Sequence, residues 1–182
     1  MKRSLILALF STILFAGSLT AASDYLLEID GIKGESSDDR HRGTIEIESF
    51  SWGMSNSGTT TAGGGGGSGK VNIQDFSFTT KLSKASPQLI MACATGQHIK
   101  SAKLFVRKQG TEQQQDYYVI TLSDCLVSSF SQVGQGSGAA GGVDAAPSES
   151  ISLYFNSIAV QYTADDGSVT SGTAVHPPVA TP

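Results

Sequence analysis

The sequence has few of the residues and patterns that mark several protein classes. Of its 182 residues only two are cysteines, Cys93 and Cys125, and only 15% are charged. Two cysteines cannot form the dense disulfide framework of small secreted domains. The sequence leaves open whether they form one bridge or remain two buried thiols. Stability therefore has to come from a hydrophobic core, which a chain of this length can build.

Patterns for catalysis and for metal or cofactor binding are also missing. No serine lies in a Gly-x-Ser-x-Gly elbow, and Cys93 lies between two alanines in an apolar segment, which is typical of an inert thiol. The three histidines have no ligand spacing, and the acidic first loop lacks the central glycine and terminal glutamate of a calcium loop (His41, His98, His176; Asp30, Glu35, Asp38, Asp39). The loop is better interpreted as a solvated acidic turn. We expect no enzyme, no metal and no cofactor.

A membrane-spanning helix needs ~20 apolar residues in succession, and the one long apolar run, at 5–19, is shorter and interrupted by Ser and Gly. Lys2 and Arg3 precede this run and small residues follow it, which predicts a signal peptide over residues 1–22. A membrane anchor is the alternative interpretation. Of the 12 basic residues, cleavage after Ala22 removes Lys2 and Arg3 and leaves 10 against 16 acidic ones. This acidic mature chain, exported to the periplasm or the medium, is not expected to bind nucleic acid or a membrane.

Apolar residues alternate with period two in six stretches, which predicts β-strands over residues 24–30, 44–52, 71–78, 99–107, 117–130 and 151–162. The alternation changes phase within three of them, as in strands that bend or bulge between packing faces. One short helix is predicted from Ser86 as N-cap, through Pro87, to a stop at Gly96, with Leu89, Ile90 and Cys93 as its apolar stripe. These elements predict a mainly β, antiparallel two-sheet (split) β-barrel with one short α-helix.

The barrel is expected to span residues 23–162 as one domain. Long irregular loops are predicted at 53–69 and 133–147, and the Gly, Ser, Thr and Pro-rich residues 163–182 have no apolar period and are predicted to be a disordered tail.

One glycine-rich stretch comes close to a nucleotide-binding motif. Gly64-x4-Gly69-Lys70 has the P-loop spacing, but Val71 replaces the Ser or Thr that holds magnesium. The residues after Lys70 have a strand pattern, whereas a phosphate site needs a helix N-terminus there. The stretch is therefore interpreted as a flexible loop.

Three segments resemble the Hcp family, the haemolysin-coregulated tube proteins of bacterial type VI secretion. They are DYLLEIDGIKGESSDDRHRGTIEIESFSWG (24–53), GKVNIQDFSFTTKLSKASPQLIMACATGQHIKSAKLFVRK (69–108) and ESISLYFNSIAVQY (149–162). The most specific parts are Gly31 to Glu35, Gly69 to Val71 and Ser86 to Gly96. The resemblance implies a β-barrel related to phage tail tubes, in a Gram-negative bacterium.

The resemblance also implies partners. Family members form homohexameric rings that stack into a tube, carry effector proteins, and meet a VgrG-type spike and a contractile sheath. In such rings the loop after Trp52 reaches neighbouring subunits, so Trp52, Gly53, Gly69 and Lys70 are candidate interface residues.

A leader is not expected on a subunit that leaves through the injection machine. Two hypotheses therefore stand: a type VI tube protein, or an exported Hcp-like ring or binding module that acts in the periplasm or outside the cell.

Overall fold

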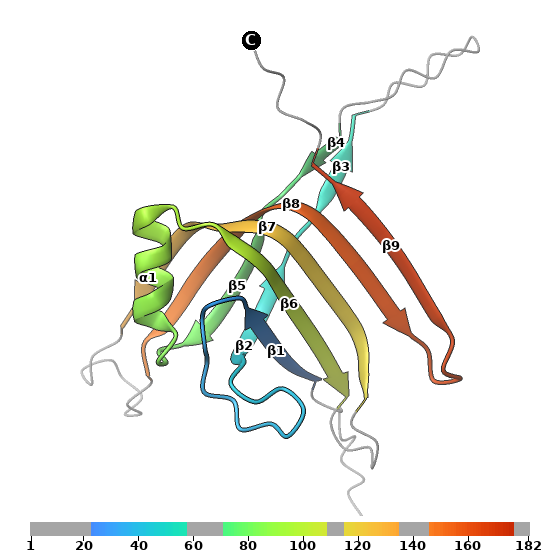
Figure 1. Ribbon diagram of the computed structural model, residues 1–182, viewed down its shortest axis with the longest axis horizontal. Helices are drawn as coiled ribbons and strands as arrows, with labels where there is room; N and C mark the ends of the chain where they lie inside the picture. The colour runs from blue at the N-terminus through green and yellow to red at the C-terminus, as the bar shows by residue number, and fades with distance from the viewer. Residues whose placement is uncertain (1–22, 58–70, 109–114, 135–145, 177–182) are drawn as a thin grey trace, which may run out of the picture.

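The computed structural model describes residues 23–57, 71–108, 115–134 and 146–176. Within them the chain forms nine strands and one helix (Figure 1). The elements are β1 Ser23–Ile29, β2 Ile45–Ser51, β3 Met54–Asn56, β4 Val71–Ile73, β5 Phe76–Lys81, α1 Ser86–Thr95, β6 Ile99–Lys108, β7 Asp116–Val133, β8 Ser148–Thr163 and β9 Val169–Val175.

Six of the strands close into an antiparallel barrel. Their order is β5-β2-β1-β6-β7-β8, and β5 pairs with β8 to complete the circle, for example at Phe78 and Ile151. Inward-facing side chains fill the interior, and Leu27, Phe76 and Phe155 have no exposed surface. Each such side chain contributes about 1.5–3 kcal/mol by leaving water. The predicted mainly β barrel with one short helix is confirmed.

The phase changes in the sequence correspond to breaks in strand geometry. In β2 the register against β5 shifts between Ile47 and Ser49, as predicted for a bulged strand. In β8 the buried face changes between Phe155 and Ile158, next to the point in β7 where Asp124 has φ 52°. The third change, between Ile73 and Phe76, separates two strands, so residues 71–78 form β4 and β5 rather than one bent strand.

The helix lies where the sequence predicts it, but its details differ. Ser86 is its first residue and Ala85 is the N-cap, so the prediction that Ser86 is the N-cap is wrong; the Ser86 hydroxyl instead makes a contact described below. Gly96 ends the helix in the left-handed conformation, with φ 63°, as predicted. Leu89 and Ala92 are buried where α1 packs against β7, whereas Ile90 is 44% exposed. The prediction that Ile90 belongs to the buried stripe is wrong.

The prediction of a disordered tail over 163–182 is also wrong for most of its length. β8 continues to Thr163, and β9 pairs with it in continuous register from Ser157 and Val175 to Thr163 and Val169. Almost all of β9 is exposed, so it needs no apolar period. Its backbone hydrogen bonds and β-prone Val and Thr residues hold it instead. Residues 177–182 lie outside the described residues.

Candidate interaction surfaces

The structure describes two of the four predicted interface residues. Trp52 follows β2 and is half-buried against the barrel core. Next to it, the carbonyl oxygen of Gly53 accepts a hydrogen bond of 2.9 Å from the backbone N–H of Gln74. Gly69 and Lys70 lie outside the described residues. Trp52 and Gly53 therefore fix the base of the segment that follows β2.

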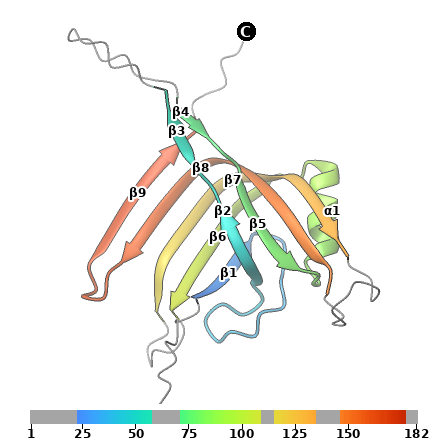
Figure 2. The same ribbon diagram turned by 180° about the vertical axis from the view of Figure 1, so that it is seen from behind.

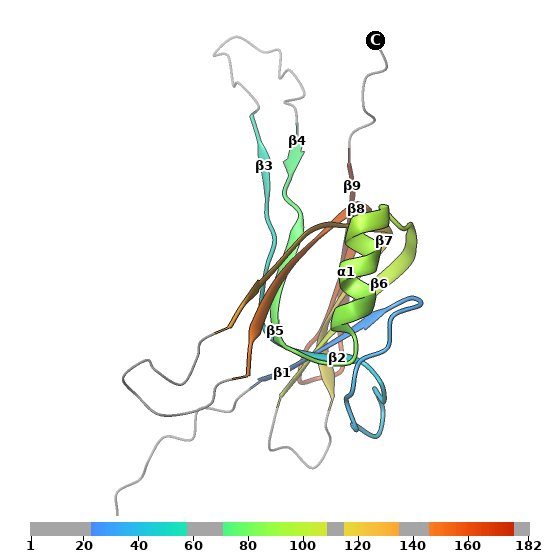
Figure 3. The same cartoon turned by 90° about the vertical axis from the view of Figure 1, so that its left-hand side faces the viewer.

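That segment begins as a strand, not as the irregular loop predicted from residue 53. Residues Met54–Asn56 pair with Val71–Ile73 to form a short antiparallel ribbon, β3–β4. Figure 3 shows this ribbon projecting away from the barrel. The three residues of β3 are exposed, Met54 by 48%, whereas Ile73 of β4 is 6% exposed and belongs to the core cluster. Residues 64–70 lie outside the described residues, and Val71, directly after them, begins a strand as the sequence predicts.

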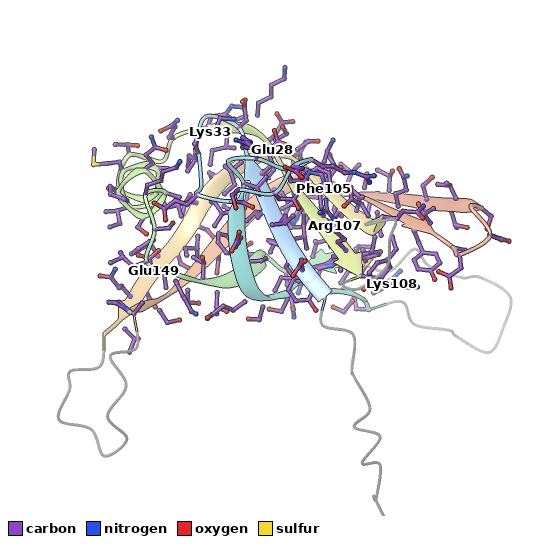
Figure 4. The ribbon with its side chains drawn as sticks, turned by 90° about the horizontal axis from the view of Figure 1, so that it is seen from below. Glu28, Lys33, Phe105, Arg107, Lys108 and Glu149 are labelled. Carbon is purple, nitrogen blue, oxygen red and sulfur yellow. The ribbon has the colours of Figure 1, made fainter. Side chains whose placement is uncertain are left out.

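The loop between β1 and β2 is held against the barrel wall by a buried arginine. Arg107, on β6, is 1% exposed, and its guanidinium donates to Asp38 Oδ2 at 2.5 Å and to Asp116 Oδ1 at 3.3 Å. His41 Nε2 lies 2.9 Å from the other oxygen of Asp116, and its ring stacks on Phe105 at 3.9 Å between centroids. Figure 4 shows Phe105 and Arg107 near each other on β6. We call Asp38, His41, Arg107 and Asp116 the loop clasp.

Two members of the loop clasp, Asp38 and Arg107, have shifted pKa values. Burial alone would raise the pKa of Asp38, but the Arg107 guanidinium and the backbone N–H groups of His41 and Arg40 outweigh it and lower that pKa. Burial likewise opposes the charge of Arg107, and its hydrogen bond to Asp38 outweighs this and raises the pKa of Arg107. Asp38 and Arg107 are therefore both charged at neutral pH.

Two glycines make the path of this loop possible. Gly31 has φ 82°, a conformation that glycine tolerates best. At Gly34 a Cβ atom would lie 2.1 Å from the Thr44 carbonyl oxygen, so only glycine fits there. Backbone geometry therefore explains the two glycines in the motif Gly31 to Glu35, and the sequence alone does not show this geometry.

An acidic cleft of about 560 Å³ lies between this loop, the start of β1 and the end of β5. Most of the charged side chains that line the cleft are carboxylates: Asp24, Glu35, Asp38, Glu46 and Glu48. Lys81 also lines it, with its Nζ 3.8 Å from Glu48 Oε1. The β1–β2 pairing has only two register pairs here, Leu26 with Glu46 and Leu27 with Ile45. The described residues nevertheless contain no group of acids, histidines and cysteines arranged to hold a metal ion.

A buried carboxyl group fastens the helix to the barrel. Glu149, at the start of β8, is 1% exposed. Its carboxylate accepts hydrogen bonds from Ser86 Oγ at 2.7 Å and from Gln132 Nε2 at 2.9 Å. The contact joins α1, β7 and β8 at the opposite end of the barrel from β9.

The cysteine question left open by the sequence is answered by the structure, in which both thiols are free. Cys125 is buried, and burial raises the pKa of its thiol to about 11. The thiol therefore stays protonated and inert at neutral pH. In the part of the chain that is described, no helix has the length and apolar character needed to cross a membrane.

The fold and its exposed features define a class of protein: a closed antiparallel β-barrel with one docked helix, a projecting ribbon and an appended edge strand. Comparisons with known proteins make this specific. Residues 26–162 match the family model described as type VI secretion system effector, Hcp. Protein hcp1 of Pseudomonas aeruginosa is 44% identical over 141 residues, which cover 78% of this chain and 83% of that protein.

Solved structures agree with this match. The crystal structure of Hcp1 from Salmonella typhimurium has a TM-score of 0.70 at 32% identity and covers 85% of this chain and 95% of its own. A type VI secretion system effector from Yersinia pestis has a TM-score of 0.68 at 25% identity, covering 84% and 99%. The chain belongs to the Hcp family of type VI secretion system proteins. It is thus a structural protein and not an enzyme.

Two features were missed by reasoning from sequence. The pairing of Arg107 with Asp38 joins residues far apart in the chain, and no spacing rule predicts it. The strand β9 did leave a signal, because Asp166-Gly167 is a hairpin turn pair between two β-prone runs. Gly167 has φ 81° in that turn.

Proposed function

We propose that this chain is a tube subunit of a type VI secretion system, which closes into homohexameric rings and stacks them into a conduit that carries or stabilises effector proteins. The observation that carries the proposal is the family match across the whole barrel, residues 26–162. The barrel is a closed body, and a head-to-tail contact between such bodies gives a ring when its rotation closes. A VgrG-type spike and a contractile sheath are the further partners of this role.

The exposed parts of the molecule support self-assembly. The β3–β4 ribbon projects from the base formed by Trp52 and Gly53. The segment from Gly53 to Gly69 is the proposed contact with a neighbouring subunit or ring. A strand edge that faces solvent in an isolated subunit has unpaired backbone groups and favours aggregation unless another chain covers it. The excess of acidic over basic residues also argues against binding to nucleic acid or to an anionic membrane.

A second candidate function rests on residues 1–22. Their basic start, apolar run and small residues before Ser23 have the order of a signal peptide. On that basis the alternative is an exported ring or binding module with the same barrel, which acts in the periplasm or outside the cell without an injection tube.

Native mass spectrometry and negative-stain microscopy of residues 23–182 test the self-assembly that both candidates share. The expected result is a hexamer in the mass spectrum and ring-shaped particles in the micrographs. A protein that stays monomeric at high concentration in both measurements would overturn ring formation.

A further inference from the structure

β1 begins at the first residue that the predicted leader cleavage leaves. Cleavage after Ala22 would make Ser23 the new N-terminus, and Ser23 is also the first residue of β1. Its register partner is Lys108 at the end of β6, and the pairing continues without a register shift to Ile29 and Ala102. No residue therefore separates the bond to be cleaved from a paired strand.

The start of β1 is held by its backbone and by a side chain. The Asp30 N–H donates to the Ser101 carbonyl at 3.0 Å. Alternate residues of an antiparallel pair direct their backbone groups to the same side, so Asp24 also directs its N–H and C=O to β6. The next residue, Tyr25, packs its ring edge-on against Phe50 of β2, with 5.3 Å between the ring centroids. The residues just after the predicted cleavage point are thus part of the fold.

β1 also lies inside the barrel wall and not at an edge of the sheet. Figure 2 shows it with β2 and β6 beside it, in agreement with the strand order. Its residues Leu27 and Ile29 belong to the core and are at most 1% exposed. Release of the whole strand would expose these side chains and break the closed circle of strands, so it amounts to opening the barrel.

A peptidase needs the opposite arrangement around the bond that it cleaves. It holds the neighbouring residues as a single extended segment, which is why cleavage concentrates where the backbone is exposed and weakly bonded. In the reaction, the oxygen of a water molecule adds to the Ala22 carbonyl carbon and the C–N bond breaks. Ala22 is left with a carboxyl group, and the Ser23 nitrogen takes a proton from the water and leaves as an α-amino group. Ser23 and Asp24 cannot lie in a peptidase active site and pair with β6 at the same time.

We propose that leader cleavage and barrel folding exclude each other: a signal peptidase hydrolyses the Ala22–Ser23 bond only before the barrel closes, and a chain that folds first keeps residues 1–22. This inference rests on the second candidate function, in which residues 1–22 are a signal peptide, and it names the event that decides the fate of the chain. The N-terminus then records the order of events. A chain cleaved before folding begins at Ser23, whereas a chain that folds first begins at Met1.

The first test compares three substrates of a purified bacterial signal peptidase in mild detergent. They are the folded chain 1–182, a peptide of residues 1–30 that carries the same bond without β6, and a folded chain with the spacer Ser-Gly-Ser-Gly-Ser-Gly inserted between Ala22 and Ser23. The folded chain should be cleaved at least about a hundredfold more slowly than the peptide. The spacer moves the bond away from β1, so that variant should be cleaved as fast as the peptide while folded.

The second test asks whether cleavage of the folded chain follows the opening of the barrel. When opening is fast relative to cleavage, the rate is proportional to the fraction of open molecules. Gly34→Ala sets a Cβ against the Thr44 carbonyl and destabilises the barrel, whereas a Cβ at Gly172 meets no atom within 4 Å. We expect Gly34→Ala to be cleaved about a hundredfold faster than wild type, and Gly172→Ala at the wild-type rate.

The outcomes separate this inference from the function on which it rests. A folded chain cleaved as fast as the peptide would overturn the inference and leave the signal peptide standing. The same holds for a folded spacer variant that stays uncleaved, or for a cleavage rate that does not rise in Gly34→Ala when its unfolding free energy has fallen. A peptide of residues 1–30 that the peptidase does not cleave would overturn the signal peptide, and the inference with it.

Discussion

Arg107 is a full positive charge in the barrel wall with almost no contact with water. Such a charge is costly unless charged partners surround it, and here Asp38 and Asp116 supply the opposite charge. The result is that one side chain of β6 fixes the loop between β1 and β2. This loop also forms one wall of the acidic cleft, so the shape of the cleft depends on the loop clasp.

The loop clasp should make stability depend on acid. The folded-state pKa of Asp38 lies below its ordinary value of 3.8, so the clasp stabilises the fold above that pH and loses its contribution as the pH falls further. Urea unfolding between about pH 7 and pH 2 should show a smaller loss of unfolding free energy in Asp38→Asn than in wild type. The control is Asp39→Asn, because the Asp39 side chain is 100% exposed. Equal acid sensitivity of wild type and Asp38→Asn would contradict the assignment.

Gly34 gives a second prediction at the scale of one residue. The change Gly34→Ala places a methyl group against the Thr44 carbonyl, and moving the loop aside would strain the 2.8 Å hydrogen bond from the Gly34 N–H to the Gly43 carbonyl. We expect a loss of about 3 kcal/mol in unfolding free energy, measured by chemical denaturation. Gly172→Ala is the matched control, since a Cβ there meets no atom within 4 Å. Equal stability of the two variants would contradict the close approach at Gly34.

At the scale of elements, α1 shows how a helix without its own cap is held. Its N-cap Ala85 makes no side-chain hydrogen bond, and its first turn has no acidic residue. The carboxyl group of Glu149 on β8 accepts a hydrogen bond of 2.7 Å from the hydroxyl of Ser86, the first residue of the helix. The helix is thereby tied to the barrel at its N-terminus.

Removing this tie should loosen α1. Glu149→Ala is expected to cost about 2–4 kcal/mol, since it leaves Ser86 and Gln132 without a buried acceptor. Thermal unfolding and hydrogen exchange of α1 measure the effect. Glu48→Ala, at a side chain 47% exposed, should change the unfolding free energy by less than about 0.5 kcal/mol. An equally small effect at both positions would show that Glu149 does not hold the helix.

The elements also show what the sequence can and cannot predict. Alternation revealed the barrel strands because one face of each is buried, and the phase changes revealed the bulge at Ile47. The same rule missed β9, whose two faces are mostly exposed and whose pairing depends on backbone atoms. It also placed Ile90 in the buried stripe, because a two-turn apolar segment does not determine which side of the helix meets the barrel.

At the scale of the molecule, the pattern of strands, turns and one helix in the sequence was enough to predict the barrel. Three segments of the sequence were enough to predict the family. The individual contacts did not follow, because the clasp of Arg107 with Asp38 and the bond of Glu149 with Ser86 exist only once distant segments meet. Of the predicted interface, Trp52 and Gly53 lie at the base of the β3–β4 ribbon, and their role between subunits remains a proposal.

The most direct test of the central claim follows how the native protein leaves the cell. The amount of this chain in the culture medium is compared between a parent strain and a strain that lacks the contractile sheath, each with and without residues 1–22. A tube subunit should be found in the medium of the parent and be lost from the medium of the sheath-deficient strain. Export that is unchanged by loss of the sheath and abolished by loss of residues 1–22 would contradict the tube role and favour the exported module.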